Sequence, residues 1–353
     1  MRITVLGAGY MGSAMACVAR RRGHDVRLWG TWLDDAMLDP CERGAPHPRL
    51  KRTLDGVALF RAARLADALA GADLVVHAVN SEGAVPVMTR AAPDLPDVPV
   101  LSVTKGLLES RRTGRMDRID VVVSEELGRP VRFVHAAGPA KAVEVARGVL
   151  TWMSFAGPGR AAPHAGDAAL CARALEGDGL VVSTSDDLAG AELCSALKNA
   201  YATGLGLWDG YLGADAHNAR AAGFTQSIVE MRALVTAAGG RAETVHGPAG
   251  VGDLHVTAAA GRNRAFGERV GKGRPAREVA AEMLAAGELT EGYPAIATAW
   301  RFARERAVAP LPLLAALHAI AWEGAAVGPA LDGFGAAWAA SISTSPAATS
   351  TDR

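Results

Sequence analysis

Cysteine, aromatic residues and net charge are all scarce in this chain of 353 residues. The four cysteines, Cys17, Cys41, Cys171 and Cys194, are widely spread and form no CxxC pair, which argues against a zinc site or a disulfide framework. We therefore expect reduced thiols, no bound metal and a cytoplasmic location. Lys plus Arg number 37 and Asp plus Glu also number 37. Without a basic excess, a general nucleic-acid binder is not expected, although a small cationic pocket is compatible with a neutral chain.

Signals for membrane insertion or export are also lacking. The uncharged run 307–322 is short and carries Pro310 and Pro312, so no membrane span is predicted. A strand-like run begins at Arg2, so no secretory leader is expected. At about 150 residues per domain the length suggests two domains, and 50% of the residues are apolar, which is enough for two cores.

Strand-like and helical patterns alternate in the first half of the chain. The expected strands are Ile3–Leu6, Val26–Trp29, Leu74–Val79, Val100–Val103, Val131–Ala136 and Leu180–Ser183. From about Asp186 only long helical patterns occur, including 188–207, 216–238 and 276–286. Alternation followed by helices predicts an α/β, Rossmann-like, doubly wound sheet over 1–185 and an all-α domain over 186–340. The Ser- and Ala-rich stretch 341–353 is expected to be a disordered tail.

A glycine motif follows the first expected strand. Gly7-Ala8-Gly9-Tyr10-Met11-Gly12 has the GxGxxG spacing and leads into a helix. In this context the first glycine permits a tight turn, the second admits a pyrophosphate, and the third allows close helix packing. We therefore predict that this end of the chain binds NAD or NADP.

The choice between NAD and NADP is left open by the end of the second strand. An acid there would bind the ribose 2′-hydroxyl, whereas an arginine would favour a 2′-phosphate. Neither type is in place in Gly30-Thr31-Trp32. Asp34 and Asp35 come slightly later and are more typical of a helix cap or a solvated surface.

Two further motifs follow expected strands. Thr104-Lys105-Gly106 comes after 100–103, and Gly138-Pro139 comes after 131–136. In parallel sheets such strand ends face the ligand crevice. The alternatives are a solvated loop cation for Lys105 and an ordinary helix start for Gly138-Pro139.

Lys198-Asn199 lies inside an apolar helical run. A charged lysine is costly to desolvate among apolar neighbours, so its pKa tends to fall. Such a lysine can exchange a proton with a hydroxyl or carbonyl group. The alternative is a lysine that extends from the helix rim into solvent. Asn218-Ala219-Arg220 is most simply a helix cap with a surface ion pair.

The last motif combines an acid with basic residues. Asp253 follows Gly250 and Gly252, and Thr257 and the run Arg262-Asn263-Arg264 come next. Arginine offers a bidentate fork to phosphate, and the acid could hydrogen-bond a hydroxyl or orient a lysine. This set predicts a site for a phosphorylated polyol, with a solvated loop as the alternative.

Taken in order, these motifs resemble the bacterial type of the NAD(P)-dependent sn-glycerol-3-phosphate dehydrogenase family. The likeness spans residues 3 to about 322 and includes Asn-Ala-Arg, Arg-Asn-Arg-x-Phe-Gly and Glu-Gly-Tyr. It implies an oxidoreductase that interconverts glycerol 3-phosphate and dihydroxyacetone phosphate. Lys198 would be the proton donor and acceptor, with Lys105 and Asp253 at the reaction site.

The resemblance also implies two sets of binding residues. The substrate would contact Lys105, Gly138, Asn199, Asp253, Thr257, Arg262 and Asn263. The cofactor would contact Gly7, Gly9, Tyr10, Met11, Gly12, Thr31, Trp32, Lys105, Ala142, Arg262, Leu289 and Glu291.

One departure from the family pattern concerns the substrate. After Gly-Pro the family usually has Ser or Thr and then Phe, whereas this chain has Ala140 and Lys141. Tyr10, Met11 and Gly261 are further deviations. A dehydrogenase for another phosphorylated polyol, sugar or cyclitol is therefore the first alternative, and a non-catalytic cofactor-binding sensor is the second. The Ala- and Gly-rich helices of the second domain are compatible with a homodimer face or with a core.

Overall fold

A computed structural model describes residues 1–259 and 261–343. It divides into two compact units. The first contains Met1–Lys198 and Val235–Val256, and the second contains Asn199–Leu234 and the described residues from Thr257 onward. A single cut after residue 185 does not reproduce this division. Of the expected disordered tail, Ser341–Ser343 form the end of a helix, and 344–353 lie outside the described residues.

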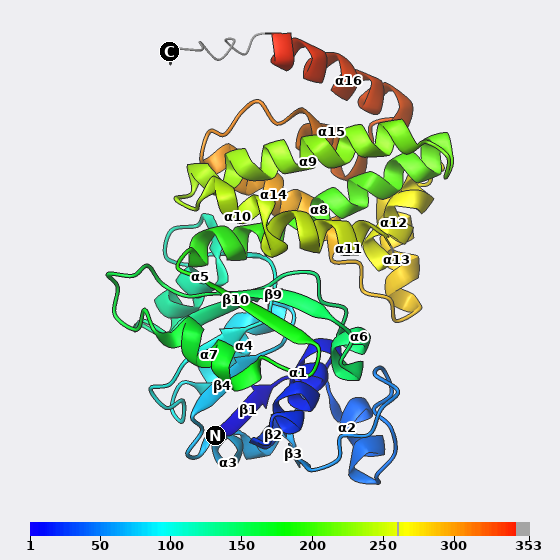
Figure 1. The fold of residues 1–353 in the computed structure, drawn as a ribbon. Coiled ribbons are helices and arrows are strands. Elements are labelled where there is room, and N and C mark those ends of the chain that lie inside the picture. The colour runs from blue at the N-terminus through cyan, green and yellow to red at the C-terminus, as the bar shows by residue number, and fades with distance from the viewer. Residues whose placement is uncertain (260, 344–353) are drawn as a thin grey trace. The chain divides into compact units, whose positions relative to one another are not determined.

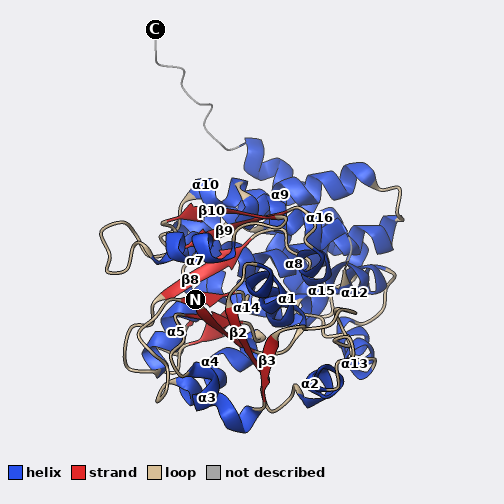
Figure 2. Cartoon of the chain, turned by 60° about the horizontal axis from the view of Figure 1, so that its bottom comes forward, coloured by secondary structure: helices blue, strands red, loops and turns tan. Residues whose placement is uncertain are grey.

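The first unit is built on an eight-stranded sheet of order β10-β9-β8-β5-β4-β1-β2-β3 (Figure 2). Its strands are β1 Arg2–Leu6, β2 Asp25–Trp29, β3 Val57–Phe60, β4 Leu74–His77, β5 Val100–Ser102, β8 Phe133–Ala137, β9 Thr151–Ala156 and β10 Leu180–Ser185. All neighbours pair in parallel except β8 and β9, which are antiparallel. The doubly wound sheet predicted from the alternation is therefore confirmed, with one antiparallel pair added. A separate hairpin joins β6 (Leu107–Glu109) and β7 (Met116–Arg118).

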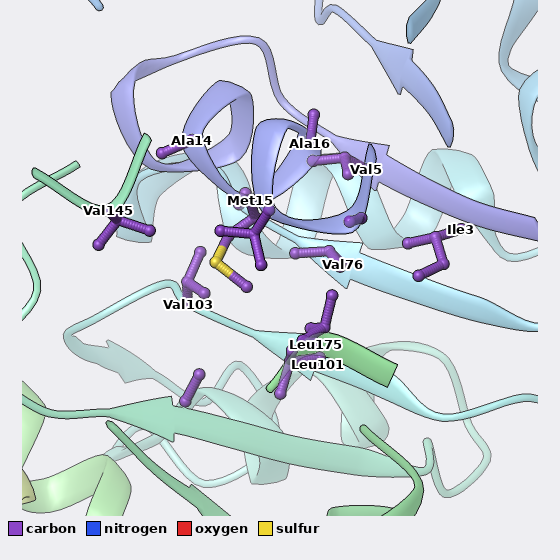
Figure 3. Close-up of a cluster of buried hydrophobic side chains, with 14 of the residues drawn as sticks. Ile3, Val5, Ala14, Met15, Ala16, Val76, Leu101, Val103, Val145 and Leu175 are labelled. Atoms are coloured by element: carbon purple, nitrogen blue, oxygen red, sulfur yellow. The ribbon is translucent and has the colours of Figure 1, made fainter. Parts of the chain in front are cut away.

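Helices cover both faces of this sheet (Figure 1). They are α1 Tyr10–Arg21, α2 Asp35–Glu42, the 3₁₀ turn η1 Ala62–Arg64, α3 Leu65–Leu69, α4 Ser81–Ala91, α5 Ile119–Glu126, α6 Ala142–Arg147 and α7 Asp167–Leu175. Two apolar cores result, because successive strand residues point to opposite faces. One core joins Ile3, Val5 and Val76 to Met15 of α1 and Leu175 of α7 (Figure 3). The other joins Leu6 and Val75 to Met88 of α4 and Val123 of α5.

The connections place loops at one edge of the sheet. β1 pairs with β2 on one side and β4 on the other, so the chain reverses its direction of travel across the sheet at β1. In open parallel sheets, ligands bind beyond the carboxyl ends of the strands at this point. The turn between β1 and α1, which carries the glycine motif, leaves the sheet there.

The rest of the described chain is helical. It comprises α8 Leu188–Leu212, α9 His217–Ala237, α10 Ala242–His246, the π-helical turn η2 Pro248–Gly252, α11 Asp253–Ala259, α12 Arg262–Gly271, α13 Ala276–Ala285, α14 Gly292–Glu305, α15 Pro312–Trp322 and α16 Val327–Ser343. No strand occurs among the described residues after β10, as predicted. No helix in the described ranges is long and apolar enough to span a membrane.

Glycines let two helices of the second unit approach closely. A Cβ atom on Gly206 or Gly210 of α8 would collide with backbone of α12, and one on Gly267 or Gly271 of α12 would collide with backbone of α8. Close backbone contact therefore fixes how α12, which begins at Arg262, lies against α8 within this unit.

Candidate active site

The glycine turn has the geometry that a dinucleotide needs. Gly7 has φ +110°, and a Cβ there would lie 2.6 Å from the Ala78 carbonyl oxygen. A Cβ on Gly12 would collide with the Gly7 carbonyl. At Gly9 an added Cβ would meet no described atom within 4 Å, so the backbone there is open to a ligand. The turn therefore fits a pyrophosphate at the start of α1.

Two side chains that the sequence did not assign to the glycine turn hold this turn. Asp34 Oδ2 accepts hydrogen bonds from the backbone N–H of Ala8 at 3.2 Å and of Thr31 at 2.8 Å, and from Thr31 Oγ1 at 2.9 Å. Fully buried His47 contacts the Ala8 carbonyl through Nε2 at 3.0 Å. Its Nδ1 accepts from the backbone N–H of Arg49, so Nε2 carries the proton and donates.

The expectation for Asp34 was right in its position and wrong in the partners of its side chain. It occupies the N-cap position of α2 but makes no side-chain cap hydrogen bond; its carboxylate joins the glycine turn to the end of β2. Asp35 does lie on the surface, where it pairs with Arg61 at 2.9 Å. No local pattern separates the two aspartates, because the Ala8 contact comes from 26 residues away.

The predicted cofactor residues near this turn differ in exposure. Thr31 is buried, whereas Tyr10 and Trp32 are exposed and Met11 is partly buried. Arg49 lies 5.0 Å from the centroid of the Tyr10 ring and Arg90 lies 5.8 Å from that of Trp32. An arginine therefore lies over the ring of each of these two exposed aromatic residues.

The three residues predicted to be catalytic meet in the first unit. Lys105 Nζ donates to Asp253 Oδ2 at 2.6 Å, and Lys198 Nζ donates to Asp253 Oδ1 at 2.7 Å. Lys105 follows β5, Lys198 lies on α8, and Asp253 is the first residue of α11. The Asp253 side chain is 1% exposed and that of Lys198 is 9% exposed, so Lys198 does not extend into solvent.

The charge of Asp253 is maintained by its two partners. Burial alone would raise the pKa of this carboxyl, but Lys105 and Lys198 more than offset burial, and the pKa lies below its usual value. A carboxylate that accepts from both ammonium groups fixes their positions relative to each other.

The Gly138-Pro139 motif shows why glycine is required. Gly138 has φ +134°, and a Cβ there would lie 2.8 Å from the Trp152 carbonyl oxygen. The two departures from the family pattern at this motif differ in exposure, because Ala140 packs against the core and Lys141 is exposed. Ala142, a predicted cofactor residue, also packs against the core.

A second group of predicted residues meets in the second unit. The Gly292 N–H donates to Asn263 Oδ1 at 2.9 Å, Asn263 Nδ2 donates to Asn199 Oδ1 at 2.9 Å, and Asn199 Nδ2 donates to Glu291 Oε2 at 3.0 Å. A backbone donor at one end and a carboxylate at the other fix both amide orientations. Asn199 and Asn263 are buried, and this chain of bonds sets the orientation of both side chains.

Other predicted residues of the second unit are more exposed. Arg262 is exposed at the start of α12, Leu289 is 39% exposed, and Thr257 on α11 is partly buried. Arg220 donates to Asp209 at 2.6 Å, so the ion pair expected for Asn-Ala-Arg is present, but the Asp209 side chain is 3% exposed and the pair is not on the surface as expected. Asp209 also accepts from Arg264 at 2.7 Å, a link that the sequence did not indicate.

Comparisons with known proteins agree with this arrangement. The model of the N-terminal domain of NAD-dependent glycerol-3-phosphate dehydrogenase matches residues 2–161, and that of the C-terminal domain matches 187–332. An NADP(+)-dependent glycerol-3-phosphate dehydrogenase from Archaeoglobus fulgidus is 33% identical over 333 residues, which cover 92% of this chain and 96% of the relative. A glycerol-3-phosphate dehydrogenase [NAD(P)+] from Mesorhizobium japonicum is 36% identical over 328 residues, covering 90% and 87%.

A solved structure is also similar. That of glycerol-3-phosphate dehydrogenase from Coxiella burnetii has a TM-score of 0.81 and 30% identity, covering 94% of this chain and 97% of that one. These matches do not favour the alternative of another phosphorylated polyol. The chain is an NAD(P)-dependent oxidoreductase of the CH–OH group and belongs to the NAD-dependent glycerol-3-phosphate dehydrogenase family.

Proposed function

We propose that this chain interconverts sn-glycerol 3-phosphate and dihydroxyacetone phosphate, with Lys198 as the proton donor and acceptor. The observation that supports this role is the buried Asp253 carboxylate, which holds Lys198 at 2.7 Å and Lys105 at 2.6 Å in the unit that carries the glycine turn. When bound, the reduced nicotinamide supplies the hydride. The names of the relatives support the substrate.

The protein residues would divide the remaining work. Lys198 transfers a proton to the carbonyl oxygen, and Lys105 polarises that oxygen, so that developing negative charge meets prearranged donors. Arg262 binds the phosphate, and that binding energy orients the reacting carbon. Asn199, Thr257 and Asn263 hold the substrate, with Glu291 fixing the amide of Asn199.

The substrate assignment has a direct assay. Oxidation of NADH and of NADPH is followed by absorbance with dihydroxyacetone phosphate, and then with ketose and cyclitol phosphates. Activity is expected with dihydroxyacetone phosphate. A clear rate only with another phosphate would replace the substrate, and coenzyme binding without any rate would favour the non-catalytic sensor.

The role of Lys198 is tested by substitution. Lys198→Ala should lower kcat by roughly 10²- to 10⁴-fold, the usual contribution of a general acid, while the Kd for NADH or NADPH changes little. Lys272→Ala is the matched control, because Lys272 pairs with Glu268 on the surface and should keep the full rate. A Lys198→Ala enzyme with most of its rate would show that another group donates the proton.

The cytoplasmic location and a homodimer are further proposals. Light scattering of the purified protein reports the mass in solution, and a value of one chain would remove the dimer. Fractionation of the producing cells reports the location.

A further inference from the structure

Buried polar side chains continue along α8 behind Lys198. Glu192, Ser195 and Lys198 follow one another at intervals of three residues, and residues at i and i+3 are neighbours on a helix. All three are buried. Each contacts a different element of the first unit: Glu192 contacts Asp120 at the start of α5, Ser195 contacts His135 on β8, and Lys198 contacts Asp253.

Glu192 belongs to a compact group of charges. Its Oε1 accepts from the Asp120 N–H at 3.3 Å, and its Oε2 lies 3.4 Å from Arg118 Nε. Arg118 donates to both oxygens of Asp120, at 3.0 and 3.1 Å. Burial, followed by the nearby Asp120 carboxylate, raises the pKa of Glu192 well above its usual value, whereas the pKa of Asp120 is lowered despite its burial. Burial and Asp120 therefore shift Glu192 toward its protonated form.

His135 fixes Ser195. Its Nε2 lies 2.9 Å from Ser195 Oγ, and the ring is fully buried. Burial, with a smaller effect of Lys105, lowers the pKa of His135 to about 3, so the ring is neutral. Donation from Nε2 to Ser195 leaves the Ser195 hydroxyl hydrogen available to another acceptor.

Three buried side-chain atoms of the described residues make no hydrogen bond: His135 Nδ1, Glu192 Oε2 and His77 Nε2. His135 and His77 lie in one row of the sheet, because both pair with Ser102 of β5. Glu192 is one helical turn from Ser195, the partner of His135. Buried polar groups are nearly always satisfied, and internal water is the usual partner. His135 Nδ1 and Glu192 Oε2 belong to the hydrogen-bond partner of Ser195 and to the residue one helical turn before Ser195, and between them we infer a hydrated seam.

We propose that Glu192, an internal water and Ser195 form a proton path that recharges Lys198 during turnover. This inference rests on the proposed role of Lys198. After ketone reduction Lys198 is a neutral amine. Its nitrogen takes the Ser195 hydroxyl proton, the Ser195 oxygen takes a proton from the water, and the water takes one from the Glu192 carboxyl. One proton from solvent then restores Glu192 beside Arg118 and Asp120, and the hydroxyl and water rotate back.

In this path His135 is a positioning residue. It orients Ser195 through Nε2 and the water through Nδ1 but transfers no proton itself. Arg118 is 19% exposed, so the end of the seam at Arg118 reaches solvent. In alcohol oxidation the same path runs in reverse and removes the proton that Lys198 accepts.

The test compares Glu192→Gln and Ser195→Ala with Glu126→Gln, whose parent residue lies on α5 outside the seam beside Arg111. Glutamine keeps the shape of Glu192 and is uncharged but supplies no proton, so the kcat of Glu192→Gln separates a proton donor from a purely structural residue. We expect kcat for dihydroxyacetone phosphate reduction to fall about tenfold in both seam variants, with unchanged Kd for NADH. The solvent isotope effect on kcat should rise, and added imidazole buffer should restore part of the rate. Glu126→Gln should match the parent enzyme.

The outcomes separate this proposal from the proposed function. Wild-type kcat, isotope effect and buffer independence in Glu192→Gln and Ser195→Ala would overturn the path while leaving Lys198 as the acid. A full rate in Lys198→Ala would overturn the role of Lys198 itself. Thermal melting identifies any variant that fails to fold, and His135→Gln, expected to lose less rate than Ser195→Ala, then serves as the second probe.

Discussion

Single glycines decide whether the buried amides of the second unit can form their chain of hydrogen bonds. A Cβ on Gly292 would collide with Thr203 Oγ1 and lie 2.9 Å from the Asn199 carbonyl oxygen. The Gly292 N–H also starts the chain of bonds through Asn263 and Asn199. This position therefore links packing to the orientation of predicted substrate residues.

Gly292→Ala should lower the free energy of unfolding by about 1–3 kcal/mol, the usual cost of overpacking. It should also raise KM for dihydroxyacetone phosphate. Gly333→Ala in α16 is the control, since an added Cβ there meets no described atom within 4 Å and alanine favours a helix. Urea unfolding measures the free energy of unfolding of both variants, and the absorbance assay measures KM. Equal stability of the two variants would contradict the steric argument.

Asp34 and Asp35 form a natural pair for testing the glycine turn. Asp34→Ala removes the acceptor of three hydrogen bonds at the turn and at Thr31, so we expect the Kd for NADH and NADPH to rise roughly tenfold, or about 1.4 kcal/mol. Asp35→Ala removes only a surface ion pair and should bind coenzyme normally. Fluorescence titration with NADH and NADPH measures these Kd values. Equal Kd values in the two variants would contradict the role of Asp34.

The residues that we propose to be catalytic stand in sequence motifs, whereas the residues that hold the glycine turn do not. Lys105, Lys198 and Asp253 stand in motifs whose order is informative, and the structure brings them together. Asp34 and His47 have no such pattern, because their role depends on reaching Ala8, 26 and 39 residues away. The Glu192 partners are likewise set by tertiary contacts.

At the scale of elements, the strands that are well buried and the helices that are long were predictable from the sequence. The six expected strands are present, and four of them are almost wholly buried, which gives continuous apolar runs. The sequence missed β3, which has four residues that are only partly buried or exposed, and β9, where polar residues and an exposed Trp152 interrupt the pattern. It also missed β6 and β7, which have three residues each. The helices α8, α9 and α13 were found because long runs carry the clearest signal.

The first turns of α8 should make stability depend on pH. The folded-state pKa of Glu192 is raised by burial and then by Asp120, so its contribution is fully present below the unfolded pKa of about 4.3 and is lost as pH rises toward the folded value. Glutamine does not titrate. Glu192→Gln should therefore gain stability over the parent protein above about pH 4, by up to about 1.4 kcal/mol per pH unit.

Chemical denaturation at several pH values measures this difference directly. Because both proteins share every other titrating group, the comparison isolates Glu192. A difference in unfolding free energy that stays constant between about pH 4 and pH 8 would show that Glu192 ionises normally in the folded state.

At the scale of the whole molecule, the chain passes three times between the two compact units, after Lys198, Leu234 and Val256. The first unit therefore depends on residues beyond the expected boundary at 185. Asp187, for example, accepts from the Arg241 N–H at 2.9 Å and from Thr244 Oγ1 at 2.5 Å. Sequence alone locates the change from the α/β pattern to the helical pattern. It does not show that Val235–Val256 belongs to the first unit.

A fragment of residues 1–185 should consequently fail to melt cooperatively, because it lacks α10, η2 and Asp187. A linked variant that ends at Val256 and replaces 199–234 by about ten Gly and Ser residues should retain the first unit and melt cooperatively. Circular dichroism on heating compares the two. A cooperative transition in fragment 1–185 would show that residues 186–198 and 235–256 are dispensable for this unit.

The continuity of α8 has a consequence for how this gene can change. Glu192, Ser195, Lys198, Asn199 and Thr203 all take their positions from one helix, and each residue turns it by about 100° and advances it by 1.5 Å. Substitutions between these sites alter one contact at a time. A single-codon insertion or deletion there would instead rotate every later residue away from its partner at once. We therefore expect this segment to tolerate substitutions but not changes in length, because its length sets the position of Lys198 and of every later contact of the helix.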